Sequence, residues 1–304
     1  MFAGCDPGFG EPCAYRDVTQ KTKTAGENML RIGIILHSQR SDALEYAARA
    51  VGYLKARQVE VSAEDEFASL LTVTPFSRTD RVDVILSLGG DGTLLRGVQY
   101  AFRWEAALLG INLGRVGFLT EVEAREIESA LECVISGSYD TETRPLLHVD
   151  AEGQHWHALN DVVLSRGGSA RLTTINAWVD GELSGRYVAD GVVVATPTGS
   201  TGYSLSAGGP IISPKVDCMV ITPICAHTLQ HRPTVVHGGA GIDLELLPED
   251  VQRAALQVDG QSCMELTSGM RVKIRMDARP IRLIRLKPQN FFQLVRDKLT
   301  EWTR

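Results

Sequence analysis

Three glycines and an aspartate stand together in LSLGGDGTLLRG, residues 86–97, directly after an apolar run and directly before apolar residues at helical spacing. The first backbone N–H groups of a helix lack partners within it and carry partial positive charge, which favours phosphate oxygens. Glycine permits positive φ and lets the backbone approach an anion closely. The stretch therefore predicts a phosphate-binding turn formed by Gly89, Gly90, Gly92 and Thr93.

Asp91 is the unusual member of this turn, because phosphates repel a carboxylate unless it binds a cation or accepts a proton. Both uses occur in phosphoryl transfer, where a positioned Asp orients a hydroxyl nucleophile and accepts its proton. The alternative is that Asp91 and Gly92 form a turn dipeptide, like other Asp-Gly pairs of the chain. The chain contains neither G-x-x-x-x-G-K-[ST] nor a G-x-G-x-x-G after a strand, which excludes an ordinary P-loop or Rossmann fingerprint.

A second unusual stretch is DGVVVATPTGSTGYSLSAGGPI, residues 190–211, in which glycines and hydroxyl side chains crowd together. We predict a binding loop from which no core is built, with Tyr203 stacked on a base or ring. A flexible linker is the alternative. The hydroxyls that the loop offers to ribose or phosphate oxygens belong to Thr198, Ser200, Thr201, Ser204 and Ser206.

Asn160 and Asp161 begin another apolar run, where an amide and a carboxylate could hold paired ribose hydroxyls. An Asx turn that caps the strand is the alternative at this position.

The elements that must position these residues alternate between strand and helix in the first half of the chain. Nearly continuous apolar runs are typical of parallel strands buried on both faces, and each run is followed by apolar residues at helical spacing. The predicted strands are 32–36, 82–88 and 107–111, and the predicted helices are 44–54 behind a possible Ser41 N-cap, 94–102, and 127–134 ending at Gly137.

After residues 144–145 the pattern changes to short β-like runs divided by the turn dipeptides Asp180-Gly181, Asp190-Gly191 and Asp259-Gly260. A hairpin is expected over 175–188, with late strands at 272–276 and 281–286. An amphipathic helix with Phe291, Phe292, Val295, Leu299 and Trp302 on one stripe ends the chain, and it either returns to the first domain or makes a subunit contact.

The predicted fold class is α/β, with an amino-terminal Rossmann-like domain and a carboxyl-terminal β-rich, sandwich-like domain. The predicted boundaries are a flexible leader at 1–30, the α/β domain at 31–143, the β-rich domain at 144–288 and a terminal helix at 289–304 that packs on the α/β domain.

Composition limits the partners of this 304-residue chain, of which 44% is hydrophobic. A net charge of -6 argues against nucleic acid or an anionic membrane as the main partner. No apolar stretch is long enough to span a bilayer and the leader lacks a secretory core, so we expect a cytoplasmic protein. Six cysteines without a C-x-x-C pair, and a His227/His231 pair without a third ligand, disfavour a zinc site.

Six motifs in order (GGDGTLLR, GINLGRVGFLTE, ALNDVVLS, the 190–211 stretch, TPICAHTLQHRP and VDGQ) make residues 31–288 similar to the NAD kinase family. The resemblance implies a cleft between an α/β and a β-rich domain as the site. It also implies homo-oligomers, dimers or tetramers, whose subunits complete one another's sites.

The resemblance also assigns roles to individual residues. Asp91 matches a general base toward the 2'-hydroxyl of the adenosine ribose of NAD, and Phe118 matches a position near the adenine and ribose. Asn160 and Asp161 match an Asn-Glu pair that holds ribose hydroxyls, with Asp one methylene shorter than Glu. Asp190 matches an acidic residue at the nicotinamide end. The remaining nucleotide-binding candidates are Arg96, Thr198, Thr201, Tyr203 and Ser206.

The predicted reaction is transfer of a phosphoryl group from ATP or polyphosphate to NAD, giving NADP, with Mg²⁺ or another divalent ion offsetting the repulsion between the two polyanions. One alternative is a diacylglycerol or sphingoid lipid kinase, which shares GGDGT, although Arg96 stands where that group usually carries an acidic residue. Another is a non-catalytic NAD(P)-binding regulator, for which a carboxylate beside phosphates would bring little benefit.

Overall fold

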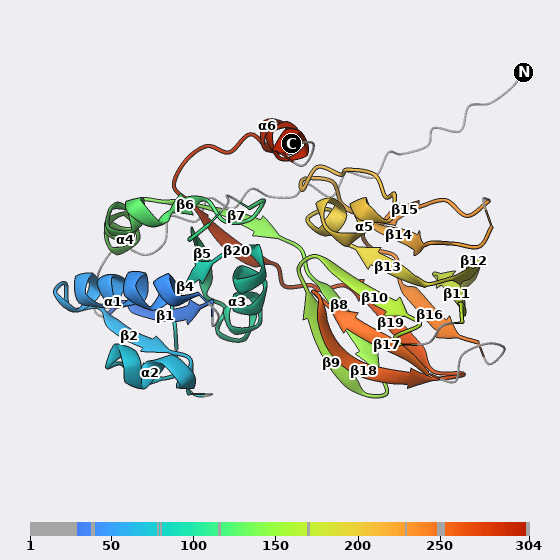
Figure 1. Ribbon diagram of the computed structural model, residues 1–304, viewed down its shortest axis with the longest axis horizontal. Helices are drawn as coiled ribbons and strands as arrows, with labels where there is room; N and C mark the ends of the chain where they lie inside the picture. The colour runs from blue at the N-terminus through green and yellow to red at the C-terminus, as the bar shows by residue number, and fades with distance from the viewer. Residues whose placement is uncertain are drawn as a thin grey trace, which may run out of the picture.

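Two domains lie side by side in the computed structural model, which describes residues 29–37, 40–77, 79, 81–114, 117–168, 171–228, 230–247 and 253–301 (Figure 1). Most of the predicted leader and Trp302 lie outside these residues. No helix in the described ranges is long and apolar enough to cross a bilayer.

The first domain is built on a mixed sheet with the strand order β3-β2-β1-β4-β5-β20-β7, in which β6 also pairs with β5. Every residue of the two central strands that lead to the glycine turn and to the loop beyond it is buried, as parallel strands covered on both faces require. The elements are β1 (Arg31–Leu36), α1 (Ser41–Lys55), β2 (Glu60–Ala63), α2 (Asp65–Leu71), β3 (Thr74–Pro75), β4 (Val84–Gly89), α3 (Asp91–Trp104), β5 (Ala107–Asn112), β6 (Val122–Glu123), a 3₁₀ turn (Ala124–Glu126), α4 (Ile127–Ser136) and β7 (Asp140–Arg144).

The second domain is a sandwich of two antiparallel six-stranded sheets, with orders β15-β14-β13-β10-β17-β18 and β12-β11-β16-β19-β8-β9. Alternate apolar residues of both sheets meet in one core. The elements are β8 (Leu147–Ala151), β9 (Gln154–Ala158), β10 (Asp161–Ser165), β11 (Thr173–Val179), β12 (Glu182–Ala189), β13 (Gly191–Ala195), a 3₁₀ turn (Gly199–Thr201), α5 (Tyr203–Ser206), β14 (Cys218–Ile224), β15 (Thr234–His237), β16 (Ile242–Leu246), β17 (Arg253–Val258), β18 (Gln261–Thr267) and β19 (Arg271–Met276).

The chain returns to the first domain through β20 (Ile281–Arg285), which pairs parallel with β5 and antiparallel with β7. The predicted boundary at 288 placed this strand in the second domain, which is wrong. Its apolar pattern fits either sheet, so the pattern could not reveal which one the strand joins. The two domains are therefore connected twice, between β7 and β8 and between β19 and β20.

Asp190-Gly191 divides two strands, as expected, and because it connects β12 in one sheet with β13 in the other it forms no hairpin. One smaller prediction is also corrected. The N-cap of α1 is Arg40, and Ser41 is the first helical residue. The two other Asp-Gly pairs do form hairpin turns with positive φ, at 50° and 83° for Asp180-Gly181 and at 47° and 77° for Asp259-Gly260.

The terminal helix α6 (Phe291–Glu301) is present as expected. It buries Val295 but leaves Phe292 61% exposed. Figure 1 draws it apart from α1 and α3. Its packing on the first domain stays a prediction.

Candidate active site

The predicted phosphate turn joins the carboxyl end of β4 to the first turn of α3. Gly90 is the N-cap of the helix, and its carbonyl accepts hydrogen bonds from the N–H groups of Thr93 and Leu94, both at 3.1 Å. A Cβ atom at Gly89 would overlap the side chain of Thr93, whereas at Gly90 and Gly92 it would meet no atom of the described residues within 4 Å. The space beside the last two glycines is therefore open to a ligand.

One of the two predicted reasons for the glycines, a positive φ, is wrong. None of Gly89, Gly90 and Gly92 has a positive φ, and Gly90 has a φ of -109°. Close packing at Gly89 and free approach at the other two positions, and not left-handed backbone, account for the absence of side chains.

The Asp91 carboxylate faces the loop that follows β5. Its Oδ1 accepts hydrogen bonds from the N–H groups of Leu119 (3.2 Å) and Thr120 (3.1 Å) and from Thr120 Oγ1 (3.3 Å). Its Oδ2 accepts one, from the N–H of Phe118 at 2.7 Å. A carboxylate has about four lone-pair directions, so the described contacts leave capacity on Oδ2 for a further donor.

The same loop explains a glycine that sequence reasoning missed. A Cβ atom at Gly117 would overlap the Asp91 carboxyl group, so this position must lack a side chain for the contact to form. The only signal in the sequence was the Gly-Phe pair itself.

A buried charge network connects this loop to the second domain. Arg285 Nη1 donates to the carbonyl of Leu119 at 3.3 Å, and Arg285 Nε bonds Glu142 at 2.8 Å. Glu142 also pairs with Arg144 at 2.9 Å, and Arg144 Nη1 donates to the hydroxyl of Thr198 at 3.2 Å. Nearby Arg144 and Arg285 hold the pKa of Glu142 below its usual value in spite of its burial. The loop beside Asp91 and the 190–211 stretch are thus joined through charged side chains.

Asn160 and Asp161 lie at the start of β10 and are held by a residue about a hundred positions away. Asp259 accepts hydrogen bonds from the N–H groups of Leu159 (2.8 Å), Asn160 (2.8 Å) and Asp161 (3.1 Å). It belongs to the β17–β18 turn of the VDGQ motif. This capping role was missed, because the sequence indicated a turn there but not what its side chain reaches.

The carboxyl group of Asp161 and the amide of Asn160 both face Gly202 in the 190–211 stretch. A Cβ atom at Gly202 would lie 3.6 Å from Asp161 Oδ2 and 3.9 Å from Asn160 Nδ2. The backbone N–H of Tyr203 also donates to the Asp161 carboxylate. The structure therefore brings the Asn-Asp pair and the glycine-rich stretch together.

Burial dominates the electrostatics at this point. Asp161 is only 6% exposed, and burial together with the nearby Asp259 raises its pKa to about 7. Burial raises the pKa of Asp259 to about 6, against the opposing effect of its three backbone donors. These two carboxyl groups are thus protonated more readily than ordinary aspartates.

The 190–211 stretch is a packed element, which corrects the prediction that no core is built from it. Residues 191–201 are all buried. Thr201 donates to the carbonyl of Thr198, and Ser200 donates to that of Pro197. Ser204 bonds the hydroxyl of Thr222. These hydroxyls thus hold the loop together, while Tyr203 is 44% exposed and Ser206 is exposed.

Three other predicted residues are placed as follows. Arg96 bonds Glu64 at 2.6 Å and the carbonyl of Leu36 at 2.7 Å, so its charge is already paired and not directed at a phosphate. Asp190 pairs with Arg166 at 2.8 Å. Phe118 is half-buried beside Asp91.

Comparisons with known proteins agree with this geometry. The family model described as the ATP-NAD kinase N-terminal domain matches residues 32–139, and the ATP-NAD kinase C-terminal domain matches residues 159–286. The NAD kinase of Desulforamulus reducens is 36% identical over 284 residues, covering 90% of this chain and 98% of the relative. That of Syntrophotalea carbinolica is 39% identical over 282 residues, covering 89% and 98%.

Two solved structures share the fold. Yeast NADH kinase complexed with NADH has a TM-score of 0.83 and 28% identity, covering 90% of this chain and 89% of that one. An NAD kinase from Archaeoglobus fulgidus in complex with ATP has a TM-score of 0.70 and 26% identity, covering 89% and 99%. The lipid-kinase and regulator alternatives find no support in these matches. With both family domains matched in order across the two domains of the fold, the chain belongs to the ATP-NAD kinase family.

Proposed function

We propose that this protein transfers the terminal phosphoryl group of ATP to the 2'-hydroxyl of the adenosine ribose of NAD, producing NADP and ADP. The observation that carries the proposal is the Asp91 carboxylate, placed between an open glycine turn and the Phe118 loop with one oxygen able to accept another donor. The bound NADH and ATP of the two related structures support these substrates.

The donor phosphates lie, in this proposal, at the amino end of α3 beside Gly90 and Gly92. Asp91 Oδ2 orients the ribose hydroxyl and accepts its proton. The freed oxygen forms the new P–O bond while the bond to the bridging oxygen of ADP breaks. Because Oδ1 remains bonded to Leu119 and Thr120, the carboxylate keeps its orientation as the proton arrives.

The adenosine ribose is held by Asn160 and Asp161, with Phe118 and Tyr203 against the adenine and Thr201 and Ser206 nearby. Arg96 is not part of the proposal, since its guanidinium bonds Glu64 and the carbonyl of Leu36. The hydroxyl of Thr198 accepts a hydrogen bond from Arg144 and keeps its own proton for a phosphate oxygen. Asp190 is assigned to the nicotinamide end of NAD. The protein is further proposed to act as a homo-oligomer, a dimer or tetramer, in the cytoplasm.

Magnesium fits the donor set at α3 in one specific way. Mg²⁺ prefers oxygen ligands and commonly takes one or two carboxylates together with substrate phosphates and water. The described residues at this turn offer Asp91 and no acidic cage, so the ion is expected to arrive with the nucleotide. When bound, it neutralises the charge of the donor phosphates.

The glycine turn gives a direct test. Gly92→Ala adds a methyl group that meets no atom of the residues that the structure describes, so its free energy of unfolding should be unchanged or higher by up to about 1 kcal/mol. Because this methyl enters the proposed phosphate space, the KM for ATP should rise at least several-fold. Gly89→Ala is the matched control: it should lower stability by about 1–3 kcal/mol through overlap with Thr93. Urea denaturation and steady-state kinetics measure both. An unchanged KM in Gly92→Ala would contradict the phosphate position.

The activity itself is tested with purified protein, Mg²⁺, NAD or NADH, and ATP or polyphosphate as the donor, while NADP(H) formation is followed enzymatically. We expect NADP with ATP. Binding of NADP without turnover under every donor and metal would overturn the proposal. Light scattering of the same sample measures the oligomeric state.

A further inference from the structure

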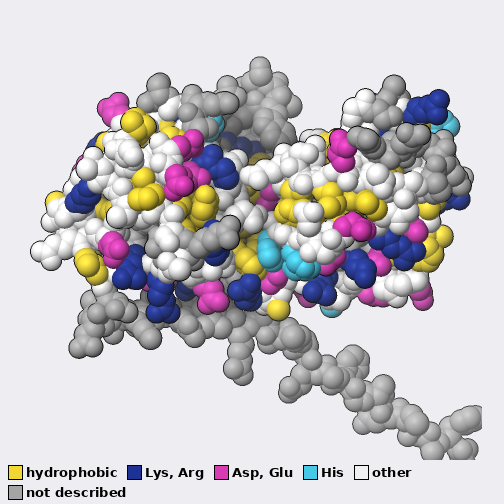
Figure 2. Space-filling view, turned by 90° about the horizontal axis from the view of Figure 1, so that it is seen from below, with side chains coloured by type: hydrophobic (Ala, Val, Ile, Leu, Met, Phe, Trp, Pro, Cys, Tyr) yellow, Lys and Arg dark blue, Asp and Glu magenta, His cyan; other side chains and the backbone are white. Residues whose placement is uncertain are grey.

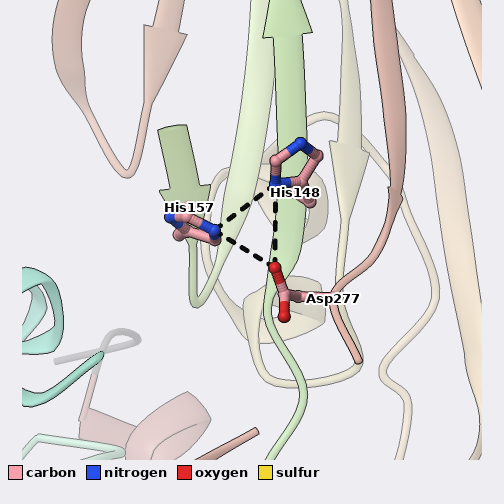
Figure 3. Close-up of side chains that lie close together, drawn as sticks. All are labelled: His148, His157 and Asp277. Atoms are coloured by element: carbon pink, nitrogen blue, oxygen red, sulfur yellow. Dashed lines mark hydrogen bonds and ion pairs between the residues drawn. The ribbon is translucent and has the colours of Figure 1, made fainter. Parts of the chain in front are cut away.

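Two histidines and an aspartate come together outside the proposed nucleotide site (Figure 3). His157 Nε2 lies 3.1 Å from Asp277 Oδ2. His148 Nδ1 lies 3.4 Å from His157 Nε2 and 3.7 Å from Asp277 Oδ2. Among the described residues, no other group of three or more His, Cys, Asp or Glu side chains brings its ligand atoms this close together.

The fold assembles this cluster through strand register. His148 on β8 stands directly opposite His157 on β9, and opposite Arg275 on β19. Asp277 follows Arg275 by two positions, just beyond the end of β19. Because side chains two apart in a strand point to the same face, the three residues share one face of the sheet. The spacing of 9 and 120 positions explains why no local motif revealed them.

The distances match one face of a metal tetrahedron. With edges of 3.4, 3.7 and 3.1 Å, a point about 2.1 Å from all three atoms lies out of their plane, within the range of Zn–N and Zn–O bond lengths in proteins. Two imidazole nitrogens and one carboxylate oxygen are also a donor set that zinc commonly takes, with water as the fourth ligand. The side chains are 18%, 19% and 13% exposed, so the fourth position can be reached by water.

The surroundings hold these ligands in place. The other oxygen of Asp277, Oδ1, accepts the N–H of Arg279 at 2.8 Å, which leaves Oδ2 directed at the histidines. The ring of His157 packs on Phe102 with centroids 3.9 Å apart.

We propose that His148, His157 and Asp277 form a Zn²⁺ site at the junction of the two domains, separate from the magnesium that accompanies the nucleotide. His148 follows the first crossing of the chain between domains, and Asp277 begins the second. The carbonyl of His157 accepts a hydrogen bond from Gln99 of α3 at 2.8 Å. In Figure 2 histidine side chains gather near the middle of the face, where the two lobes meet.

A bound ion would connect the two chain segments that cross between the domains. It would also link them to the carboxyl-terminal part of α3, the helix that begins at Asp91. We therefore expect the metal to stabilise the protein against heat and to restrict movement between its domains.

Binding is tested on chelator-treated protein without nucleotide. Zn²⁺ is titrated calorimetrically with Mg²⁺ in excess, and Co²⁺ serves as a spectroscopic probe because a tetrahedral site gives intense visible absorption. The variants are His148→Asn, His157→Asn and Asp277→Asn, the last of which keeps an acceptor for Arg279. His155→Asn is the matched control: its ring stacks near His148 at 5.3 Å and it pairs with Asp150, but it is outside the cluster.

Wild type and His155→Asn should bind one Zn²⁺ per chain and gain thermal stability, with the tetrahedral Co²⁺ spectrum. Each cluster variant should bind Zn²⁺ at least about ten-fold more weakly and gain no thermal stability from it. The melting temperature of the metal-free variant shows that it is folded. Absence of saturable binding by wild type would overturn the proposal. So would equal weakening by His155→Asn, or binding that survives all three cluster substitutions and therefore occurs elsewhere, for example at His227 and His231.

Discussion

Asp91→Asn is expected to lower kcat by about 10²–10⁴-fold, the usual contribution of a general base, while NAD affinity changes only a few-fold. The amide has nearly the same shape but cannot take the proton of the ribose hydroxyl. Its single carbonyl oxygen can still accept the N–H groups of Leu119 and Thr120, whereas its NH₂ group must face the N–H of Phe118. Some loss of stability, about 1–2 kcal/mol, should accompany the loss of turnover.

Because Asp91 also holds the 118–120 loop, the variant alone does not separate proton transfer from loop positioning. Thr120→Val provides the control, since it removes the hydroxyl bond to Asp91 Oδ1 and the acceptor for Gly117 while leaving the carboxylate intact. A purely structural role of Asp91 predicts similar kinetic losses in both variants. A role in proton transfer predicts a loss of kcat in Thr120→Val of no more than about ten-fold.

The measurements are kcat and KM for NAD at saturating ATP, NAD binding by calorimetry, and melting temperatures of all three proteins. Near-normal kcat in a folded Asp91→Asn enzyme would remove the carboxylate from the chemistry. The remaining catalysis would then have to come from positioning of the two substrates.

Local patterns predicted the part of the site that is local in the chain. The glycine turn between a buried strand and a helix follows from an apolar run, a glycine cluster and helical spacing within residues 82–102, and β4 and α3 lie there. The hairpin at Asp180-Gly181 follows in the same way from a dipeptide that tolerates positive φ.

Contacts between distant segments could not be predicted in this way. Arg96 looked available for a phosphate because nothing in the sequence indicates that Glu64 will lie 2.6 Å from it. β20 looked like a strand of the second domain because burial pattern does not identify the neighbouring strands.

The hydroxyl groups of the 190–211 stretch illustrate a different difficulty. A run of Thr, Ser and Gly is equally compatible with an open loop and with a buried one whose hydroxyls bond its own carbonyls. Burial decided between the two, since Ser200 and Ser204 have no exposed surface. Composition does not distinguish an open loop from a buried one, because the partners of a hydroxyl depend on the backbone around it.

Asp161→Asn is expected to stabilise the protein at alkaline pH. The pKa of Asp161 is about 7 in the folded protein, against 3.8 as the ordinary value. Between these values the folded state binds a proton that the unfolded chain does not, so the stability of the wild type falls as pH rises from about 4 to 7. Above that range the folded protein bears the full cost of a buried charge. A neutral Asn avoids this cost, so the variant should be more stable by about 2–4 kcal/mol at pH 8.

The difference should be small near pH 4, where the wild-type carboxyl group is neutral in the folded state and half neutral in the unfolded one. Urea denaturation of both proteins at several pH values measures it. Asp259→Asn is the control, because its single carbonyl oxygen cannot serve all three backbone donors and leaves the N–H of Leu159 without its acceptor. Loss of that bond costs about 1–3 kcal/mol, which offsets the gain from removing a charge. A stability difference between Asp161→Asn and wild type that does not change with pH would contradict the raised pKa.

The same variant tests why a costly carboxylate is present at all. Asp161 faces Gly202 beside Asn160, where we place the ribose, and a carboxylate accepts hydrogen bonds from hydroxyls more strongly than an amide does. Asp161→Asn should therefore be more stable at pH 8 and yet require at least about ten-fold more NAD for half-maximal rate. If the variant gains stability with an unchanged KM for NAD, Asp161 does not contact the substrate, and the ribose must be sought elsewhere along the 190–211 stretch.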